Sequence, residues 1–226
     1  MNNKLIKAKI RGEIMYKNIF RGFAISIMLI LLLGFSIISH AQKDLKILSI
    51  NSLYSASGDY IHVVGEIENQ GNKAYSFVTL GITFYDSNDQ IVDTTTAIIS
   101  YILPGQKRPF KSMSPKHSEI KKYKVYIENM YELNEKKYDD QIKILSNRSF
   151  KSSSGDYMHV VGEVRNDSPM SFEFLTVEVT FYDKKGKVVD TTSAIIQNLS
   201  TGATKPFKTM SQYLSNVDKY LVQVSQ

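Results

Sequence analysis

The sequence repeats itself with an offset of 97 residues. Residues 46–113 and 143–210 align without a gap, and 34 of the 68 positions are identical. A period of 97 is too long for solenoid units of roughly 20 to 50 residues, and it matches one small domain. The sequence therefore predicts two copies of one folding unit. The strings that recur begin at Ser57 and Ser154 (Ser-Gly-Asp-Tyr), His62 and His159 (His-Val-Val-Gly-Glu), and Val92 and Val189 (Val-Asp-Thr-Thr).

The offset also fixes the expected domain boundaries. The second copy ends with the chain at Gln226, so the equivalent position in the first copy is Asn129. We expect a first domain over 42–129 and a second over 141–226. The excess between them, residues 130–140, is charged and indicates a linker or the frayed end of a last strand.

Alternating hydrophobicity predicts strands in both copies. From Val78 to Tyr85 the apolar positions 78, 80, 82 and 84 alternate with the others, and 175–182 repeats the pattern. We expect the even set, with Ile82 and its equivalent Val179, to be buried. Gly81 in the other set is replaced by Glu178, which indicates that this second face looks at water. A second alternation covers Val63, Gly65 and Ile67, and a third covers Tyr123, Val125 and Ile127.

Turn-forming residues separate these runs at fairly even spacing, which is typical of a β-sandwich. The predicted fold is all-β, with two tandem immunoglobulin-like sandwiches of about seven strands each and one N-terminal hydrophobic helix before them. The chain contains no cysteine, so no disulfide, thiolate metal site or cysteine nucleophile is available. Each domain must then be held by packing alone.

The first 41 residues resemble a secretory leader. Basic residues precede an apolar run from Phe23 to Ile38, and small residues at Ser39 and Ala41 precede a cleavage position. The run has 16 residues, at the border between a signal peptide and a membrane span. Two alternatives stay open: a cleaved signal on a secreted or cell-surface protein, and an anchor formed by residues 23–39. The body is exported in both.

The positive net charge is mostly local to this leader. The first 41 residues carry six of the 28 basic and one of the 22 acidic residues, which leaves 22 basic and 21 acidic residues in the body. A nearly neutral body has no general excess of charge for a polyanion. We expect no nucleic-acid partner, and membrane contact only through an uncleaved leader.

Both copies resemble the FxLYD domain of bacterial and archaeal exported proteins. The first copy matches through the residues from His62 to Asn69, Phe84-Tyr85-Asp86, Ile91 to Thr94, Leu103-Pro104-Gly105 and Phe110; the second through His159 to Asn166, Phe181-Tyr182-Asp183, Val188 to Thr191, Gly202 and Phe207. The Phe that gives the family its name is Ile82 or Val179 here. The resemblance implies an immunoglobulin-like sandwich without catalytic activity, and it supplies no site residues.

Each copy has one histidine that could bind a metal with a nearby glutamate. His62 and Glu66, like His159 and Glu163, lie on the predicted solvent face of one strand, where alternate residues project the same way. Two ligands do not make a metal site, so a structural role is favoured.

Oxygen-rich side chains follow the central strand of the first copy. Asp86, Asn88, Asp89 and Asp93 resemble a calcium loop. The second copy has Lys185 and Gly186 in this stretch, which favours an ordinary hairpin turn.

Three further residue types have structural interpretations. Asn69 and Asn166 end a strand, where the side-chain amide can replace a turn. Pro109 and Pro206 favour edge strands, and the Phe that follows each is expected to plug the core.

No catalytic motif is present in the sequence. The nucleophile elbow, the zinc-protease pair and the phosphate-binding loops are missing, and His117 is the one histidine near the join between the copies. We therefore assign no catalytic, cofactor-binding or metal residues. The predicted function is a non-catalytic binding or structural module with a protein or glycan partner at the cell surface. The alternative is a small-ligand or metal-binding envelope protein.

Overall fold

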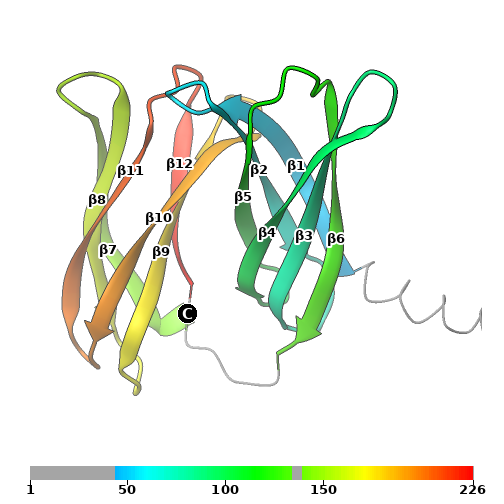
Figure 1. Cartoon of the computed structure of the whole chain (residues 1–226). Coiled ribbons are helices and arrows are strands. Elements are labelled where there is room, and N and C mark those ends of the chain that lie inside the picture. Colours follow the sequence, from blue (N-terminus) through cyan, green and yellow to red (C-terminus); the bar gives the residue numbers. More distant parts are fainter. Residues whose placement is uncertain (1–43, 134–138, 226) are drawn as a thin grey trace, which may run out of the picture. The chain divides into compact units, whose positions relative to one another are not determined.

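The computed structural model describes residues 44–133 and 139–225, which contain twelve β-strands (Figure 1). The predicted leader lies outside the described residues, as do residues 134–138 of the predicted linker. Strands of the first copy are β1 (Leu45–Tyr54), β2 (Tyr60–Asn69), β3 (Tyr75–Tyr85), β4 (Ile91–Ile102), β5 (Lys107–Pro115) and β6 (Lys122–Glu132). Strands of the second are β7 (Ile142–Lys151), β8 (Tyr157–Asn166), β9 (Phe172–Tyr182), β10 (Val188–Leu199), β11 (Thr204–Gln212) and β12 (Lys219–Ser225). A 3₁₀ turn, η1 (Asp139–Gln141), precedes β7.

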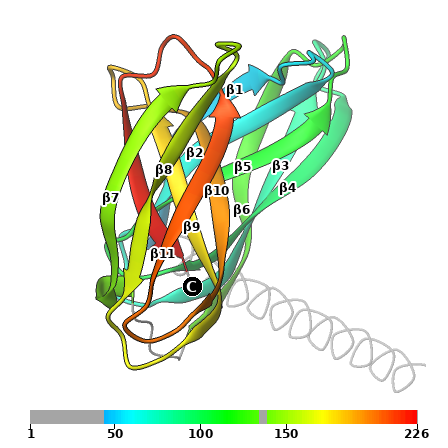
Figure 2. The ribbon, with the colours of Figure 1, turned by 90° about the vertical axis from the view of Figure 1, so that its left-hand side faces the viewer.

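Each copy forms two three-stranded antiparallel sheets with the same connectivity. The strand orders are β1-β2-β5 and β4-β3-β6 in the first copy, and β7-β8-β11 and β10-β9-β12 in the second. Figure 2 shows the sheet of β7, β8 and β11 facing the viewer. The all-β prediction is confirmed for the described residues.

The described part of each copy has six strands, so the expected count of about seven was wrong. The strands are longer than the pattern of turns suggested, and β4 runs without a break for 12 residues. A run of Thr and Ile favours extended backbone throughout, and it contains no Gly or Pro that would divide it.

The buried hydrophobic side chains of each copy form their own cluster between its two sheets. The cluster of the first copy draws on residues 45–130, and that of the second on residues 142–224. Ile82 and Val179 are 1% and 0% exposed, which confirms the predicted inward face of β3 and β9. The alternations in β2 and β6 also place their apolar sets against this core.

Gly65 lies in β2 under the ring of Phe110, which confirms that Phe110 plugs the core. A bulge in β1 between Ile47 and Ser49 brings the Ser49 carbonyl oxygen toward the same spot. A Cβ added to Gly65 would stand 2.2 Å from that oxygen and 2.4 Å from the Phe110 ring. Gly162 repeats the arrangement with Phe207 in the second copy.

Replacing Gly65 by Ala is therefore expected to lower the free energy of unfolding by about 1–3 kcal/mol, because neither backbone nor core ring can move away cheaply. Denaturant unfolding measures the change. Gly81→Ala is the matched control: the three atoms nearest its Cβ would all belong to Tyr126, a half-exposed side chain that can rotate. A loss for Gly65→Ala no larger than for Gly81→Ala would contradict this account.

Asn69 and Asn166 hold the ends of β2 and β8, as expected for structural residues. Both are fully buried. The Asn69 amide nitrogen donates to the carbonyl oxygens of Lys73 and Ile102, at 2.7 and 3.2 Å, and its side-chain oxygen accepts from the Gly71 nitrogen. Asn166 makes the equivalent bonds in the second copy. One side chain thus joins the strand, the next loop and the end of β4.

Two other expectations concern edges and boundaries. Pro109 and Pro206 lie in β5 and β11, which are edge strands of their sheets, as predicted. β6 continues to Glu132, so the first three residues of the expected linker 130–140 are strand. Across the described residues, no helix has the length and apolar character needed to cross a membrane.

Candidate functional site

The two copies meet through one sheet of each. The face of β1-β2-β5 that points away from its own core contacts the outer face of β10-β9-β12. Val64 of β2 is fully buried and packs with Tyr182 and Val188, while Leu53 covers the edge of this cluster. Leu45–Gln226 accordingly forms one compact unit.

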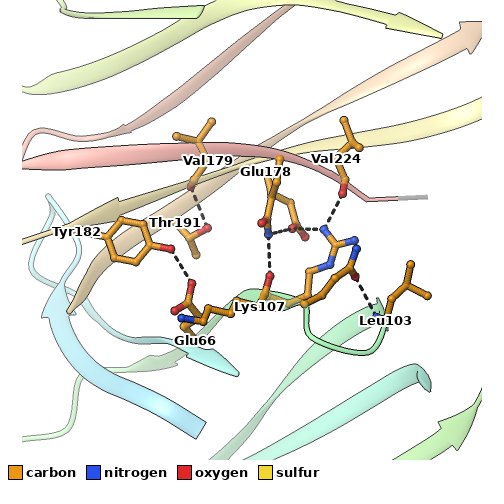
Figure 3. Close-up of polar contacts among 11 residues, drawn as sticks. Glu66, Leu103, Lys107, Glu178, Val179, Tyr182, Thr191 and Val224 are labelled. Carbon is orange, nitrogen blue, oxygen red and sulfur yellow. Dashed lines mark hydrogen bonds and ion pairs between the residues drawn. The ribbon is translucent and has the colours of Figure 1, made fainter. Parts of the chain in front are cut away.

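The Tyr182 hydroxyl donates a 2.6 Å hydrogen bond to Glu66 across this interface (Figure 3). Both side chains are buried. Burial raises the pKa of Tyr182 above its usual value of 10, and the neighbouring Glu66 carboxylate adds to the effect. The hydroxyl therefore stays protonated and available as a donor throughout the physiological range.

Arg108 of β5 extends into the second copy. Its side chain is 2% exposed, and its guanidinium donates to the Val224 carbonyl oxygen at 2.6 Å and to the Glu178 carboxylate at 3.1 Å. It also lies 4.7 Å from the ring centroid of Tyr101, a cation–π distance. Figure 3 shows Glu178 and Val224 side by side above the loop that carries Leu103.

A second ion pair joins Lys111 of β5 to Asp190 of β10. The Lys111 ammonium lies 2.7 Å from the carboxylate, which is almost fully buried. Asp190 also accepts from the Ser211 hydroxyl and from the Thr191 backbone nitrogen. A carboxylate with three donors, one of them a cation, is well satisfied despite its burial.

These contacts correct the expectation that the second face of each strand looks at water. Glu178 is partly buried and pairs with Arg108, and Glu66 is buried under Tyr182. The reason is that a charged outer face can be covered by another sheet when that sheet supplies a partner of opposite charge. The sequence contained one indication of this interface. Arg108 is replaced by Lys205 in the second copy, Glu178 is replaced by Gly81 in the first, and Arg108 and Glu178 are the residues that pair.

The predicted His–Glu metal pairs are not brought together as ligands. Glu66 accepts from Tyr182, whereas His62 lies beside a cavity with Lys111 and Asp190. In the second copy, His159 contacts the Phe150 ring and its Nδ1 lies 3.3 Å from the Thr209 carbonyl oxygen, while Glu163 is exposed. The structural interpretation of both histidines is the better one.

The cavity beside His62 has a volume of about 190 Å³ and lies at the interface. Leu53, Tyr157 and Met210 supply its apolar wall, and His62, Lys111 and Asp190 its polar one. It is smaller than typical ligand pockets of roughly 300–1,000 Å³. The Lys111 ammonium opposes the entry of a metal cation.

The pKa of His62 is lowered from its usual 6.5 because the imidazole is partly buried and because Lys111 lies nearby; Asp190 opposes this. As the pH falls below 6.5, His62 is therefore protonated in the unfolded chain before it is protonated in the folded protein. We expect the protein to lose stability below that pH, and His62→Gln to reduce the loss, as measured by denaturant unfolding between pH 7.5 and 5.

His159→Gln is the matched control for this experiment. It removes a histidine from the equivalent strand position but leaves His62 under the second copy, so the acid-induced loss should remain. An unchanged loss in the His62→Gln protein would contradict the assignment.

The oxygen-rich loop of the first copy is a turn. Asp86 accepts from the backbone nitrogens of Asn88 and Gln90, and Asp183 makes the same two bonds in the second copy. Asp89 pairs with Lys122, which lowers the pKa of that aspartate, and Asp93 accepts from Ser114. The carboxylates have separate partners, and no group of three His, Asp or Glu suited to a metal occurs among the residues described.

His117 lies exposed in the turn between β5 and β6, where its carbonyl oxygen accepts from the Ile120 nitrogen. Among the cavities described between the copies, the one with a histidine in its lining has His62 and not His117. A catalytic arrangement around His117 therefore gains no support from its surroundings.

Comparison with known proteins gives little to add to this geometry. No protein-family model matches the chain, so the FxLYD resemblance stays a prediction. An uncharacterized protein of Methanocaldococcus jannaschii is 35% identical over 66 residues, which are 29% of this chain and 49% of that protein. The chain thus spans about half the length of this curated relative.

Solved structures are similar only at a low level. An exo-chitosanase of Amycolatopsis orientalis has a TM-score of 0.29 at 14% identity, over 78% of this chain and 25% of the enzyme. A β-glucuronidase of Bacteroides uniformis has a TM-score of 0.25 at 15% identity, over 69% and 22%. The C-terminal globular domain of an oligosaccharyltransferase from Pyrococcus abyssi has 0.26 at 10% identity, over 80% and 46%. Values this low carry no inference about activity.

Proposed function

We propose that this chain is a non-catalytic exported or cell-surface protein. In this proposal residues 42–129 and 141–226 are tandem immunoglobulin-like sandwiches of the FxLYD type, and they act as binding or structural modules. Separate hydrophobic clusters in the two copies and the leader-like pattern of residues 1–41 support it.

One observation carries the binding role. The same large hydrophobic side chains are exposed at equivalent positions of both copies, although exposure of apolar surface opposes solubility. Phe77 and Phe174 are 60% and 59% exposed, and Ile98 and Ile195 are each 65% exposed. Phe77 also has a positive φ of 43°, which is uncommon for an aromatic residue and is often associated with functional positions.

Export is tested by fractionating cells that produce the full chain and sequencing the N-terminus of the recovered protein. The proposal expects the protein outside the cytosol, either cut after Ala41 or held at the membrane. Recovery from the cytosol with the initiator methionine intact, at Met1 or at Met15 if translation starts there, would overturn the export part.

The binding role is tested by sedimenting the purified protein with isolated cell envelopes of its host. Replacement of Phe77 and Phe174 by Ser should reduce the bound fraction several-fold. Replacement of the exposed polar residues Gln70 and Asp167 is the control for surface substitution. Equal binding by both variants would remove the hydrophobic positions from the proposal.

The small-ligand or metal-binding alternative has less support. Its cavity beside His62 is small and contains an ammonium group. A rise in melting temperature with Ca²⁺, Zn²⁺ or Cu²⁺ would favour the metal form of this alternative.

A further inference from the structure

The interface between the two copies is of the head-to-tail kind, because it joins two different faces of the same repeated unit. The first copy uses its β1-β2-β5 sheet, and the second uses its β10-β9-β12 sheet. The complementary face of each copy lies mostly outside this interface. It is formed by β4-β3-β6 in the first copy and by β7-β8-β11 in the second, where only Tyr157 and the end of β11 line the cavity beside His62. A heterologous contact of this kind leaves a matching surface at each end and can be repeated.

The residues that form the internal interface recur on these two faces. With the 97-residue offset, Glu66 corresponds to Glu163 in the second copy and Tyr182 corresponds to Tyr85 in the first. In the same way, the Lys111–Asp190 pair corresponds to Lys208 and Asp93. Both pairs keep their chemical identity, so the hydrogen bond and the ion pair are available to a second molecule.

The apolar contact recurs as well. Val64, Leu53 and Val188 of the internal cluster correspond to Val161, Phe150 and Ile91. Phe150 is 36% exposed and Ile91 is 65% exposed. Lys208 and Glu163 are exposed too, which leaves the second copy's face accessible to a partner. One pair of opposite charges is available between the two faces, with Lys208 on one and Asp93 on the other.

We propose that these two faces bind each other between molecules, so that the β7-β8-β11 face of one chain docks on the β4-β3-β6 face of a second copy of this chain. The inference is independent of where the protein resides. Lys208 of one chain pairs with Asp93 of the next, and Tyr85 donates to Glu163. Repetition of the contact produces a linear or ring-shaped head-to-tail assembly.

The external contact is weaker than the internal one. The Arg108–Glu178 pair has no counterpart, since the equivalent residues are Lys205 and Gly81. In addition, the internal contact is helped by the covalent connection between the copies, which raises their effective concentration. Assembly should therefore depend on protein concentration.

Cysteine crosslinking tests the contact, and the chain has no native cysteine to confuse the result. In the full chain, the Lys208→Cys protein is mixed with the Asp93→Cys protein and treated with a short bismaleimide reagent. We expect a crosslinked dimer that neither variant forms alone. Chains that carry both substitutions should give a ladder of dimers, trimers and larger species. The Lys111→Cys/Asp190→Cys protein is the positive control, because it should crosslink within one chain.

Charge reversal gives a second measurement. For this measurement the two cysteines replace Glu163 in one chain and Tyr85 in the other. In that background, Lys208→Glu alone or Asp93→Lys alone should lower the crosslinked fraction several-fold. Mixing the two reversed variants should restore the crosslink, because the carboxylate introduced at position 208 would then face the ammonium introduced at position 93. Crosslinks no stronger than in the single-cysteine controls, or crosslinks only to a protein of another mass, would overturn the proposal.

Discussion

Replacing Arg108 by Ala is expected to lower the free energy of unfolding by about 3–5 kcal/mol, because the change leaves a partly buried carboxylate without its cation. Arg108 is almost fully buried and bonds both the Glu178 carboxylate and the Val224 carbonyl oxygen. Its packing over Tyr101 is lost at the same time. Urea unfolding of the wild-type and variant proteins measures the difference.

The repeat supplies a matched control for this substitution. Lys205 occupies the position of Arg108 in the second copy, where its ammonium donates to the Gln197 carbonyl oxygen at a more exposed site. Lys205→Ala should change stability by about 0.5 kcal/mol or less, as is usual for surface positions. Equal losses for the two variants would show that the inter-copy contacts contribute nothing.

A paired substitution separates the charge from the packing. The double variant Arg108→Met/Glu178→Leu removes both charges and fills their space with apolar groups. It should recover much of the stability lost in Arg108→Ala, since buried ion pairs are often replaced by apolar pairs without loss. A double variant as unstable as Arg108→Ala would assign the effect to the Val224 bond instead.

Asn69→Ala is expected to lower the free energy of unfolding by about 3 kcal/mol, because it strands buried backbone groups that the amide had satisfied. Three hydrogen bonds are lost, to the oxygens of Lys73 and Ile102 and from the nitrogen of Gly71. Asn166→Ala should have a similar effect on the second copy. Thermal or urea unfolding provides the measurement.

Asn69→Asp tests which part of the amide matters. The aspartate keeps an acceptor for Gly71 but places a carboxylate oxygen against two carbonyl oxygens, so the loss should be at least as large as for Ala. Gln70→Ala, at the exposed neighbouring position, is the control for substitution in this loop. A loss for Asn69→Asp no greater than for Gln70→Ala would show that the donated bonds are unimportant.

The core-facing side of the strands could be predicted from the sequence alone. Alternation over 78–84 and its repeat over 175–181 identified the buried set, since the side-chain period of a strand leaves only one choice of face. Phe110 and Pro109 were also assigned correctly, as core plug and edge-strand residue. The strand count was not, because turn signals mark where strands can end and not where they do.

The outward-facing side could not be predicted in the same way. Identical His-Val-Val-Gly-Glu strings have different surroundings in the two copies: Val64 and Glu66 are buried, while Glu163 is exposed. Local pattern cannot distinguish them, because burial of this face depends on which other sheet covers it. Only the differences between the copies at Arg108 and Glu178 indicated which sheet covers this face. Their meaning becomes clear only when it is known that the two residues pair in the folded protein.

The order of the strands within each sheet has a consequence for refolding. β5 joins β2 across the intervening β3 and β4, and β11 joins β8 in the same manner. Both late strands contain Pro-Phe-Lys, so during refolding from denaturant either can add to the wrong partner. During synthesis the ribosome releases β5 before β8 has been made, so β5 can pair only with β2. In a chain that refolds by dilution from denaturant, β5 can pair first with β8, and this wrong pair must dissociate before the native sheets form.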